Sequence, residues 1–318
     1  MKTRQAELLL ISVIIARSFS FLFSKVALTG MTPENLLGVR FSLAFLILLV
    51  LFARKMRQLT LPELRGGFLI GACYCFVMFF EMLGLRLTNA STTSLIENTA
   101  IIIVPVLEIL LYKKKADLRL LLCILLAFGG VVLLSGSGGF RIGAGIFFCL
   151  LSAFGYAAAI MVTEKCSHLG DPVRIGIVQN GTMGAFFLLV SLCTASFRIP
   201  SGRTEWIMIL CLALLCSVYG FTFQPLAQRY LSASRAAEFC ALNPLSTSLA
   251  SSVFLGERLG ISGFIGAAAI LSGLFLHSHD GGKESSAESS GSSDVVCGPE
   301  SDQQTSVRRS LCAFRYSR

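Results

Sequence analysis

The side chains of this sequence that could bind or move charge are ionisable residues placed inside long apolar stretches. Arg17 lies near the middle of the stretch 6–27, and Glu97 lies in the first half of the stretch 90–112. An ionisable group costs about 2.5–3.5 kcal/mol at the centre of a membrane-spanning helix, so it persists where it is paired or faces a wet cavity. Arg17 and Glu97 are therefore candidates for holding the two charged ends of a small molecule.

A structural interpretation of the same residues stays open, in which Glu97 only pairs with Arg17. Glu108 follows Glu97 by eleven residues, about three helical turns, so the two share a helix face with Pro105. Glu108 either belongs to the same polar stripe or pairs with the basic group Lys113–Lys115 at the membrane interface.

Four uncharged side chains complete the predicted substrate-binding set. Asn243 precedes Pro244, and a proline inside a helix frees a backbone carbonyl that a neighbour or a bound molecule can use. Gln179 and Asn180 lie in the stretch 173–195, and Tyr156 lies in 143–164. Hydrogen bonding between helices is the alternative for the amides, and ordinary packing is the alternative for Tyr156.

Two further polar residues, Glu81 and Gln224, are expected to reach the membrane interface rather than a binding site. Glu81 falls near the outer end of the stretch 66–85, and Gln224 occupies the corresponding position in 206–227. Long polar side chains at such positions extend toward the lipid headgroups.

The elements that must position these residues are ten apolar stretches separated by most of the charge. Apolar residues make up 54% of the chain, charged residues 14%, and the mean hydropathy is +0.74. A helix needs about 20 apolar residues to cross the hydrocarbon core. The sequence thus predicts an all-α integral membrane protein with ten transmembrane helices, at 6–27, 35–53, 66–85, 90–112, 118–136, 143–164, 173–195, 206–227, 231–255 and 260–278.

The net charge of +9 follows from membrane topology rather than from nucleic-acid binding. Lys and Arg concentrate in cytoplasmic loops because they resist translocation. If the helices cross in turn, the loops after the second, fourth, sixth and eighth helices all fall on one side. These loops carry Arg54, Lys55, Arg57, Arg65, Lys113, Lys114, Lys115, Arg119, Lys165, Arg174, Arg229 and Arg235. We therefore expect a multi-pass protein of the cell membrane with both termini in the cytoplasm.

The helical part repeats internally. Aligning residues 80–132 with 223–275 matches Phe80 with Phe223 and Gly130 with Gly273, which gives five helices in each half. An odd number of helices inserts the second copy inverted relative to the first, as in many transporters. The expected organisation is a first five-helix repeat at 1–139, a second at 140–278, and a disordered cytoplasmic tail rich in Ser, Gly and Glu at 279–318.

At this point the chain resembles the drug/metabolite transporter superfamily, in the form with two EamA-type domains. The second half carries the clearer pattern, in Leu242-Asn243-Pro244, Leu255-Gly256-Glu257-Arg258-Leu259 and Ile265-Gly266-Ala267. The first half departs from it, because Lys113-Lys114-Lys115 stands where the family has Gly-Glu-Arg. The resemblance covers about residues 6–278 and implies a central cavity and transport of small metabolites.

We therefore expect a secondary transporter that exports a small polar metabolite, such as an amino acid, by alternating access. Protons are the expected coupling ion, because the spans carry buried carboxyl groups, and the sequence is compatible with a homodimer. Neither a cofactor nor a metal is expected, since the histidines and cysteines show no recognised ligand spacing. Two other classes stay open, a membrane-embedded lipid-modifying enzyme and a receptor-like subunit.

Overall fold

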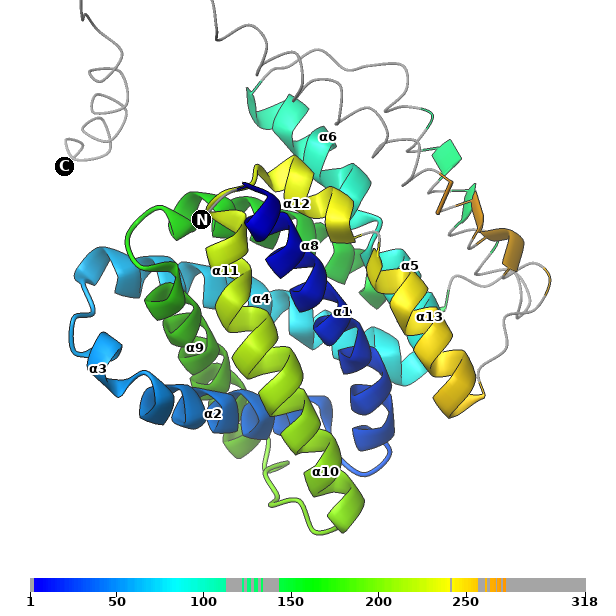
Figure 1. The fold of residues 1–318 in the computed structure, drawn as a ribbon. Helices are drawn as coiled ribbons and strands as arrows, with labels where there is room; N and C mark the ends of the chain where they lie inside the picture. Colours follow the sequence, from blue (N-terminus) through cyan, green and yellow to red (C-terminus); the bar gives the residue numbers. More distant parts are fainter. Residues whose placement is uncertain are drawn as a thin grey trace, which may run out of the picture. The chain divides into compact units, whose positions relative to one another are not determined.

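A computed structural model describes residues 3–112, 143–240 and 242–256, with isolated positions between 122 and 133 and between 261 and 272. The described residues are mostly helical, and none of them lies in a strand. The elements are α1 (Thr3–Ala27), α2 (Pro33–Leu51), α3 (Ala53–Met56), α4 (Leu61–Leu87), α5 (Ala90–Glu97), α6 (Ala100–Tyr112), α8 (Ala144–Ser167), α9 (Pro172–Cys193), α10 (Arg203–Cys211), the π-helix η1 (Leu212–Phe221), α11 (Thr222–Gln228), α12 (Ala233–Cys240) and α13 (Leu242–Leu255) (Figure 1).

Seven helical stretches in the described part of the chain are long and apolar enough to cross a membrane. They are Thr3–Ala27, Pro33–Leu51, Leu61–Leu87, Ala90–Leu111, Ala144–Ser167, Pro172–Cys193 and Arg203–Gln228. The all-helical, multi-pass prediction is thus confirmed. The predicted helices 118–136 and 260–278 lie almost wholly outside the described residues, as does the tail 279–318, so ten crossings stay a prediction.

The two equivalent helices α2 and α9 run antiparallel along each other. A Cβ atom added to Gly38 would lie 2.9 Å from the backbone nitrogen of Leu188, and one added to Gly184 would lie 2.8 Å from that of Ser42. Only glycine permits such close approach of two backbones. Because Gly38 meets the end of α9 while Ser42 meets its middle, the helices point in opposite directions, which is the relation an inverted repeat requires.

The predicted helix 90–112 has the right extent but is not continuous. It divides into α5 and α6 at Asn98 and Thr99, where both side chains bond to carbonyls of the preceding turn: Asn98 Nδ2 to Ser94 O at 2.7 Å and Thr99 Oγ1 to Ile96 O at 2.7 Å. Such local bonds compete with the regular helical ladder. In the second half α12 ends at Cys240, the repeat equivalent of Glu97, so the predicted helix 231–255 appears as α12 and α13.

Helices of each half pack against helices of the other half. Helix α1 packs against η1, α11 and α13 of the second repeat, and α8 packs against α4 and α6 of the first (Figure 1). The polar residues singled out on α1 and α8 are therefore brought to the seam between the repeats. Packing of helices across the two repeats therefore brings residues more than 130 positions apart in the sequence into one cluster.

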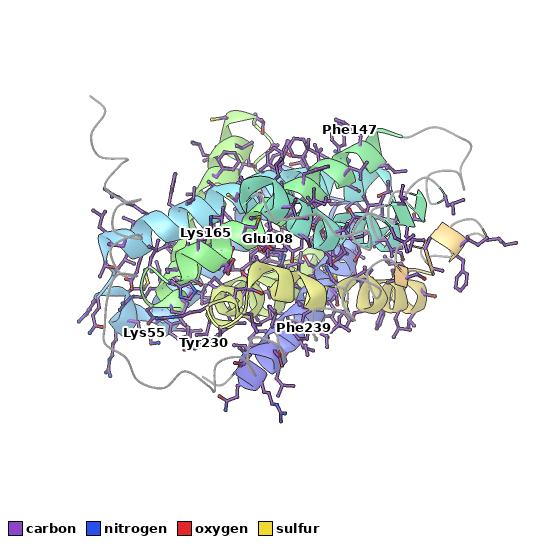
Figure 2. All side chains as sticks on the ribbon, turned by 90° about the horizontal axis from the view of Figure 1, so that it is seen from above. Lys55, Glu108, Phe147, Lys165, Tyr230 and Phe239 are labelled. Carbon is purple, nitrogen blue, oxygen red and sulfur yellow. The ribbon has the colours of Figure 1, made fainter. Side chains whose placement is uncertain are left out.

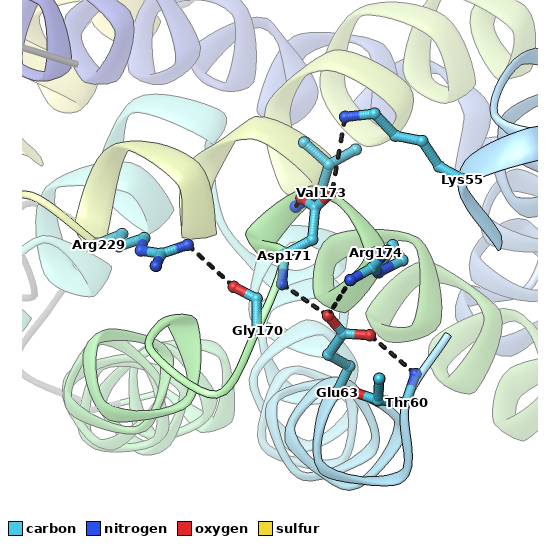
Figure 3. Close-up of polar contacts among 8 residues, drawn as sticks. All are labelled: Lys55, Thr60, Glu63, Gly170, Asp171, Val173, Arg174 and Arg229. Atoms are coloured by element: carbon cyan, nitrogen blue, oxygen red, sulfur yellow. Dashed lines mark hydrogen bonds and ion pairs between the residues drawn. The ribbon is translucent and has the colours of Figure 1, made fainter. Parts of the chain in front are cut away.

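A cluster of charged side chains joins the two repeats at one end of the bundle (Figure 3). Glu63 at the start of α4 accepts hydrogen bonds from Arg174 Nη2 at 2.5 Å and from the Asp171 backbone nitrogen at 2.7 Å. Lys55 lies 3.5 Å from the Asp171 carboxylate, and Arg229 donates to the Gly170 carbonyl at 2.9 Å. The predicted basic loops after the second, sixth and eighth helices thus meet at one end, which we call the basic end.

The opposite end is joined by the connection between α9 and α10. The side chain of Asn35 donates to the carbonyl of Arg198 at 3.0 Å, and the Arg198 guanidinium donates to the carbonyl of Gly30. Arg198 also pairs with Glu205 at 2.6 Å. Polar contacts between the two repeats therefore exist at both ends of the bundle, with the apolar spans between them.

Candidate functional site

Arg17 of α1 is the centre of a cluster of aromatic and polar side chains from both repeats. Its guanidinium lies 4.3 Å from the ring centroid of Phe221, 5.5 Å from that of Tyr156 and 5.7 Å from that of Tyr74. A cation among aromatic faces is stabilised by the ring quadrupoles, and more so where water is scarce. The three rings come from η1, α8 and α4, and each is almost fully buried.

Gln224 links Arg17 to this aromatic set through hydrogen bonds. Its Oε1 accepts from Arg17 Nη1 at 2.6 Å, and its Nε2 donates to the Tyr74 hydroxyl at 2.9 Å. Arg17 Nη1 also lies 3.3 Å from the Tyr156 hydroxyl. The prediction that Gln224 reaches the membrane interface is wrong, because it is 2% exposed and its amide is held inside by these bonds.

Two carboxyl groups, Glu81 and Glu97, lie buried beside this cluster. Glu81 is 2% exposed and Glu97 3% exposed, and the two carboxyl groups are close enough to interact with each other electrostatically. Glu97 Oε1 also accepts from Ser152 Oγ at 3.2 Å. Two like charges at close range in apolar surroundings repel each other, so a proton held between the two carboxyl groups would relieve this repulsion. The expectation that Glu81 lies at the interface is wrong, because its helix position faces the seam.

The structural alternative in which Glu97 pairs directly with Arg17 differs from what the structure shows. Arg17 directs its hydrogen bonds to Gln224 and Tyr156, and it interacts with Glu97 electrostatically rather than through a direct bond in the described part of the chain. Glu97 accepts a hydrogen bond from Ser152 instead.

Asn243 at the start of α13 lines a cavity together with Arg17 and Glu81. It is 8% exposed, and its Oδ1 has no hydrogen-bond partner among the described residues. Arg17, Glu81 and Asn243 line one small cavity together with Ser20, Phe21, Met78 and Phe221. A buried carbonyl oxygen without a partner is costly, so it marks a position where water or a bound molecule would be favourable.

The predicted residues Gln179 and Asn180 lie on α9 and do not line this cavity. Asn180 Nδ2 donates to the Gly176 carbonyl at 2.8 Å and to Thr222 Oγ1 at 3.2 Å, which ties α9 to α11. Gln179 is buried, and its amide has no hydrogen-bond partner in the described part of the chain. Their participation in binding stays a prediction.

Arg40 is a buried charge that we did not predict as a site residue. It is fully buried, donates from Nε to Ser217 Oγ at 2.8 Å and from Nη1 to Ser20 Oγ at 3.0 Å, and leaves Nη2 unpartnered among the described residues. Ser20 also lines the cavity, so Arg40 adjoins the site. The sequence carried the signal, since Arg40 is ionisable and lies within the predicted span 35–53, just as Arg17 lies within 6–27.

The cavity has a volume of about 10 Å³, close to the smallest space that accommodates one water molecule. It therefore has to enlarge before an organic molecule can enter. The residues around it offer a guanidinium, which suits a carboxylate or phosphate, and carboxyl groups, which suit an ammonium group. The charges around the cavity are of both signs, so they are suited to a polar molecule that carries a positive and a negative group.

Two antiparallel helical repeats around a polar, membrane-embedded centre are the architecture of secondary transporters. Comparison with known proteins agrees with this class. The chain belongs to the EamA-like transporter family, whose model matches it twice, over residues 4–136 and 143–278. The resemblance to this family and the two-repeat organisation are thus confirmed.

Individual relatives extend over most of the chain. An uncharacterized transporter of Archaeoglobus fulgidus is 30% identical over 283 residues, which cover 86% of each chain. The uncharacterized transporter YvbV of Bacillus subtilis is 28% identical over 284 residues, covering 86% of this chain and 92% of its own. A solved crystal structure with 16% identity matches with a TM-score of 0.64, covering 86% of this chain and 96% of the other, which supports the fold alone. These findings favour a transporter over an enzyme.

Proposed function

We propose that the protein is a secondary transporter that exports amino acids or related zwitterionic metabolites across the cell membrane by alternating access. The observation that carries this proposal is the cavity that Arg17, Glu81 and Asn243 line together, with the buried carboxyl group of Glu97 next to that of Glu81. A cargo carboxylate would replace water at Arg17, and a cargo ammonium group would bond to the carboxyl pair. We also propose that both termini lie in the cytoplasm; the meeting of basic loops at one end of the bundle supports this orientation.

The position of the cavity supports alternating access. Arg17 reaches it from the first repeat, while Phe221 and Asn243 reach it from the second. A rocking motion of one repeat against the other would change the separation of these groups without unfolding either bundle. The polar contacts at the two ends of the bundle would then break in turn.

The proposal predicts saturable exchange of amino acids through the purified protein. Full-length protein reconstituted into proteoliposomes and preloaded with one unlabelled compound should accumulate the same labelled compound transiently, well above protein-free vesicles. The panel should compare amino acids with their decarboxylated amines and with their N-acetyl derivatives, which lack one charge each. Because the site offers both charges, we expect exchange of the intact zwitterions to exceed that of either derivative. Equal exchange of all three groups would contradict a zwitterionic cargo.

A second prediction concerns proton coupling at the carboxyl pair. If one shared proton leaves Glu81 and Glu97 as cargo binds, an outward cargo flux is driven by inward proton movement. If one proton is exchanged for each cargo molecule, a gradient of one pH unit can sustain about a tenfold ratio of cargo concentrations across the membrane. Glu97→Gln fixes a neutral side chain at that position, so we expect it to retain counterflow and to lose accumulation driven by a pH gradient. The measurement is cargo uptake into vesicles with an acidic interior.

The matched control for this experiment is Glu34→Gln, at the start of α2 and away from the cavity. It should leave both counterflow and gradient-driven uptake unchanged. Coupling through this pair is excluded if Glu97→Gln still accumulates cargo in response to the gradient as the unmodified protein does.

A further inference from the structure

An apolar groove of about 920 Å³ lies between α2, α4 and α9, on the outside of the bundle and separate from the central cavity. Its walls include Phe45 of α2, Phe68 and Phe76 of α4, and Phe186 of α9. Phe68 is 61% exposed, Phe76 43% and Phe186 46%. The groove therefore has the volume of a ligand pocket, but its lining is suited to a hydrocarbon.

The groove extends along a large part of α4. Its lining on that helix runs from Leu64 to Phe80, and the sixteen helical steps between these residues correspond to roughly 24 Å. Half of a hydrocarbon core of about 30 Å is about 15 Å. A lipid acyl chain that enters from the basic end can therefore lie in the groove along its whole leaflet.

The basic end of this groove is bordered by arginines. Met56 and Leu59 line the groove there, and Arg54 and Arg57 belong to the same connection between α2 and α4. Arg65 follows one turn into α4. The side chains of Arg54, Arg57 and Arg65 are exposed, and within the described part of the chain none of the three forms an ion pair. In contrast, Lys55 is paired with Asp171.

We propose that this groove is a binding site for an anionic phospholipid, with one acyl chain along α4 and α9 and the headgroup phosphate on Arg57 and Arg65. The apolar lining alone selects no particular lipid, because all acyl chains are equally apolar. Selection comes from the headgroup, since guanidinium groups bind phosphate with paired, charge-assisted hydrogen bonds. Basic side chains beside a spanning helix attract anionic lipid in the same way.

A second copy of the chain fits the groove less well. A two-fold axis normal to the membrane would place the same surface of both copies together, so the exposed arginines of one copy would face those of the other. The apolar walls would match, but the like charges at the basic end would repel each other. A phosphate supplies the opposite charge that this end lacks.

The proposal can be tested by fluorescence quenching, because Trp206 is the single tryptophan of the sequence. The reporter is the full-length chain with Trp206→Phe and Phe68→Trp, reconstituted in phosphatidylcholine vesicles that contain brominated phosphatidylglycerol or brominated phosphatidylcholine. We expect the anionic lipid to quench at much lower mole fraction. The preference should fall about fivefold for each of Arg57→Gln and Arg65→Gln, and 0.5 M salt should reduce it without any arginine substitution.

The control reporter carries Trp206→Phe with Phe147→Trp. Phe147 belongs to α8, is 58% exposed, lies on the upper side of the molecule in Figure 2, and is not part of the groove. It should be quenched equally by both lipids. Equal quenching at position 68 would overturn the proposal, because it would mean contact with bulk lipid only. Protection of position 68 from both lipids in a chain that cross-links as a dimer would also overturn it.

Discussion

Arg17→Gln is expected to abolish transport while the protein remains folded. Arg17 supplies the positive charge of the central cavity, and loss of one partner from a hydrogen-bonded charge contact reduces binding by about a hundredfold or more. We expect this loss in the rate of amino-acid counterflow at subsaturating cargo. Arg17→Lys should cause a smaller loss, because lysine keeps the charge but not the planar fork that pairs with a carboxylate.

Stability distinguishes a binding role of Arg17 from a structural one. Glutamine at position 17 can keep a hydrogen bond to the Gln224 carbonyl while the charge is removed, so the melting temperature of the detergent-solubilised protein should change little. The matched control is Arg86→Gln in the last turn of α4, an exposed site where the same change should alter transport by no more than about twofold. A variant of Arg17 that melts earlier but transports normally would show that the residue serves the fold alone.

The course of the helices could be predicted from the sequence because hydrophobic length and charge distribution depend on local residues. The stretches 66–85 and 173–195 correspond closely to α4 and α9. The breaks were not predicted, because Asn98 and Thr99 terminate α5 through bonds to their own helix that no hydropathy pattern contains. The π-helical form of η1 likewise has no equivalent in the matching part of α4.

The candidate site was predicted only in part, because some of its residues have a local sequence signal and others are brought together only by the packing of the helices. Arg17 and Glu97 stand out in the sequence as charges in apolar surroundings. The partners of Arg17 could not be predicted in this way, because they depend on which helices of the two repeats pack against each other. Gln224 and Glu81 occupy equivalent repeat positions, and both point to the seam, so the repeat itself offered a signal that we attributed to the interface. Tyr74 carried no such signal, because a tyrosine in an apolar helix is ordinarily a packing residue.

Glu63→Gln is expected to have the largest effect on stability among single changes at the ends of the bundle. The Glu63 side chain is 1% exposed, and that of its partner Arg174 is 15% exposed. It accepts further hydrogen bonds from the backbone nitrogens of Asp171 and Thr60, at 2.7 and 2.9 Å. Breaking a fully buried ion pair from one side costs about 3–5 kcal/mol. Because Arg174 keeps partial access to water, we expect a loss at or below the lower end of this range. Thermal unfolding should show this loss, and Glu63→Gln combined with Arg174→Gln should recover part of it.

The matched control for this prediction is Glu205→Gln at the opposite end. The Arg198–Glu205 pair has a similar distance of 2.6 Å, but its side chains are 38% and 20% exposed, so its loss should cost no more than about 1 kcal/mol. If the two variants unfold at the same temperature, burial of Glu63 does not make its ion pair more stabilising than the exposed pair.

The same contact should also decide how readily the basic end opens, because Glu63 belongs to the first repeat and Arg174 to the second. Cys166 is a native reporter of opening: it is 6% exposed and lies beside Gly66, one turn from Glu63. Conformational coupling of this kind usually amounts to about 1–3 kcal/mol. If the Glu63–Arg174 contact favours the closed end by this amount, its loss should accelerate Cys166 alkylation by about 5- to 150-fold.

Peptide mass spectrometry measures this rate, with exposed Cys193 as the reactive reference and buried Cys216 as the unreactive one. If Cys166 and Cys216 become reactive together in Glu63→Gln, the Glu63–Arg174 contact stabilises the fold as a whole. If Cys166 alone becomes reactive, the Glu63–Arg174 contact closes the basic end of the transport path.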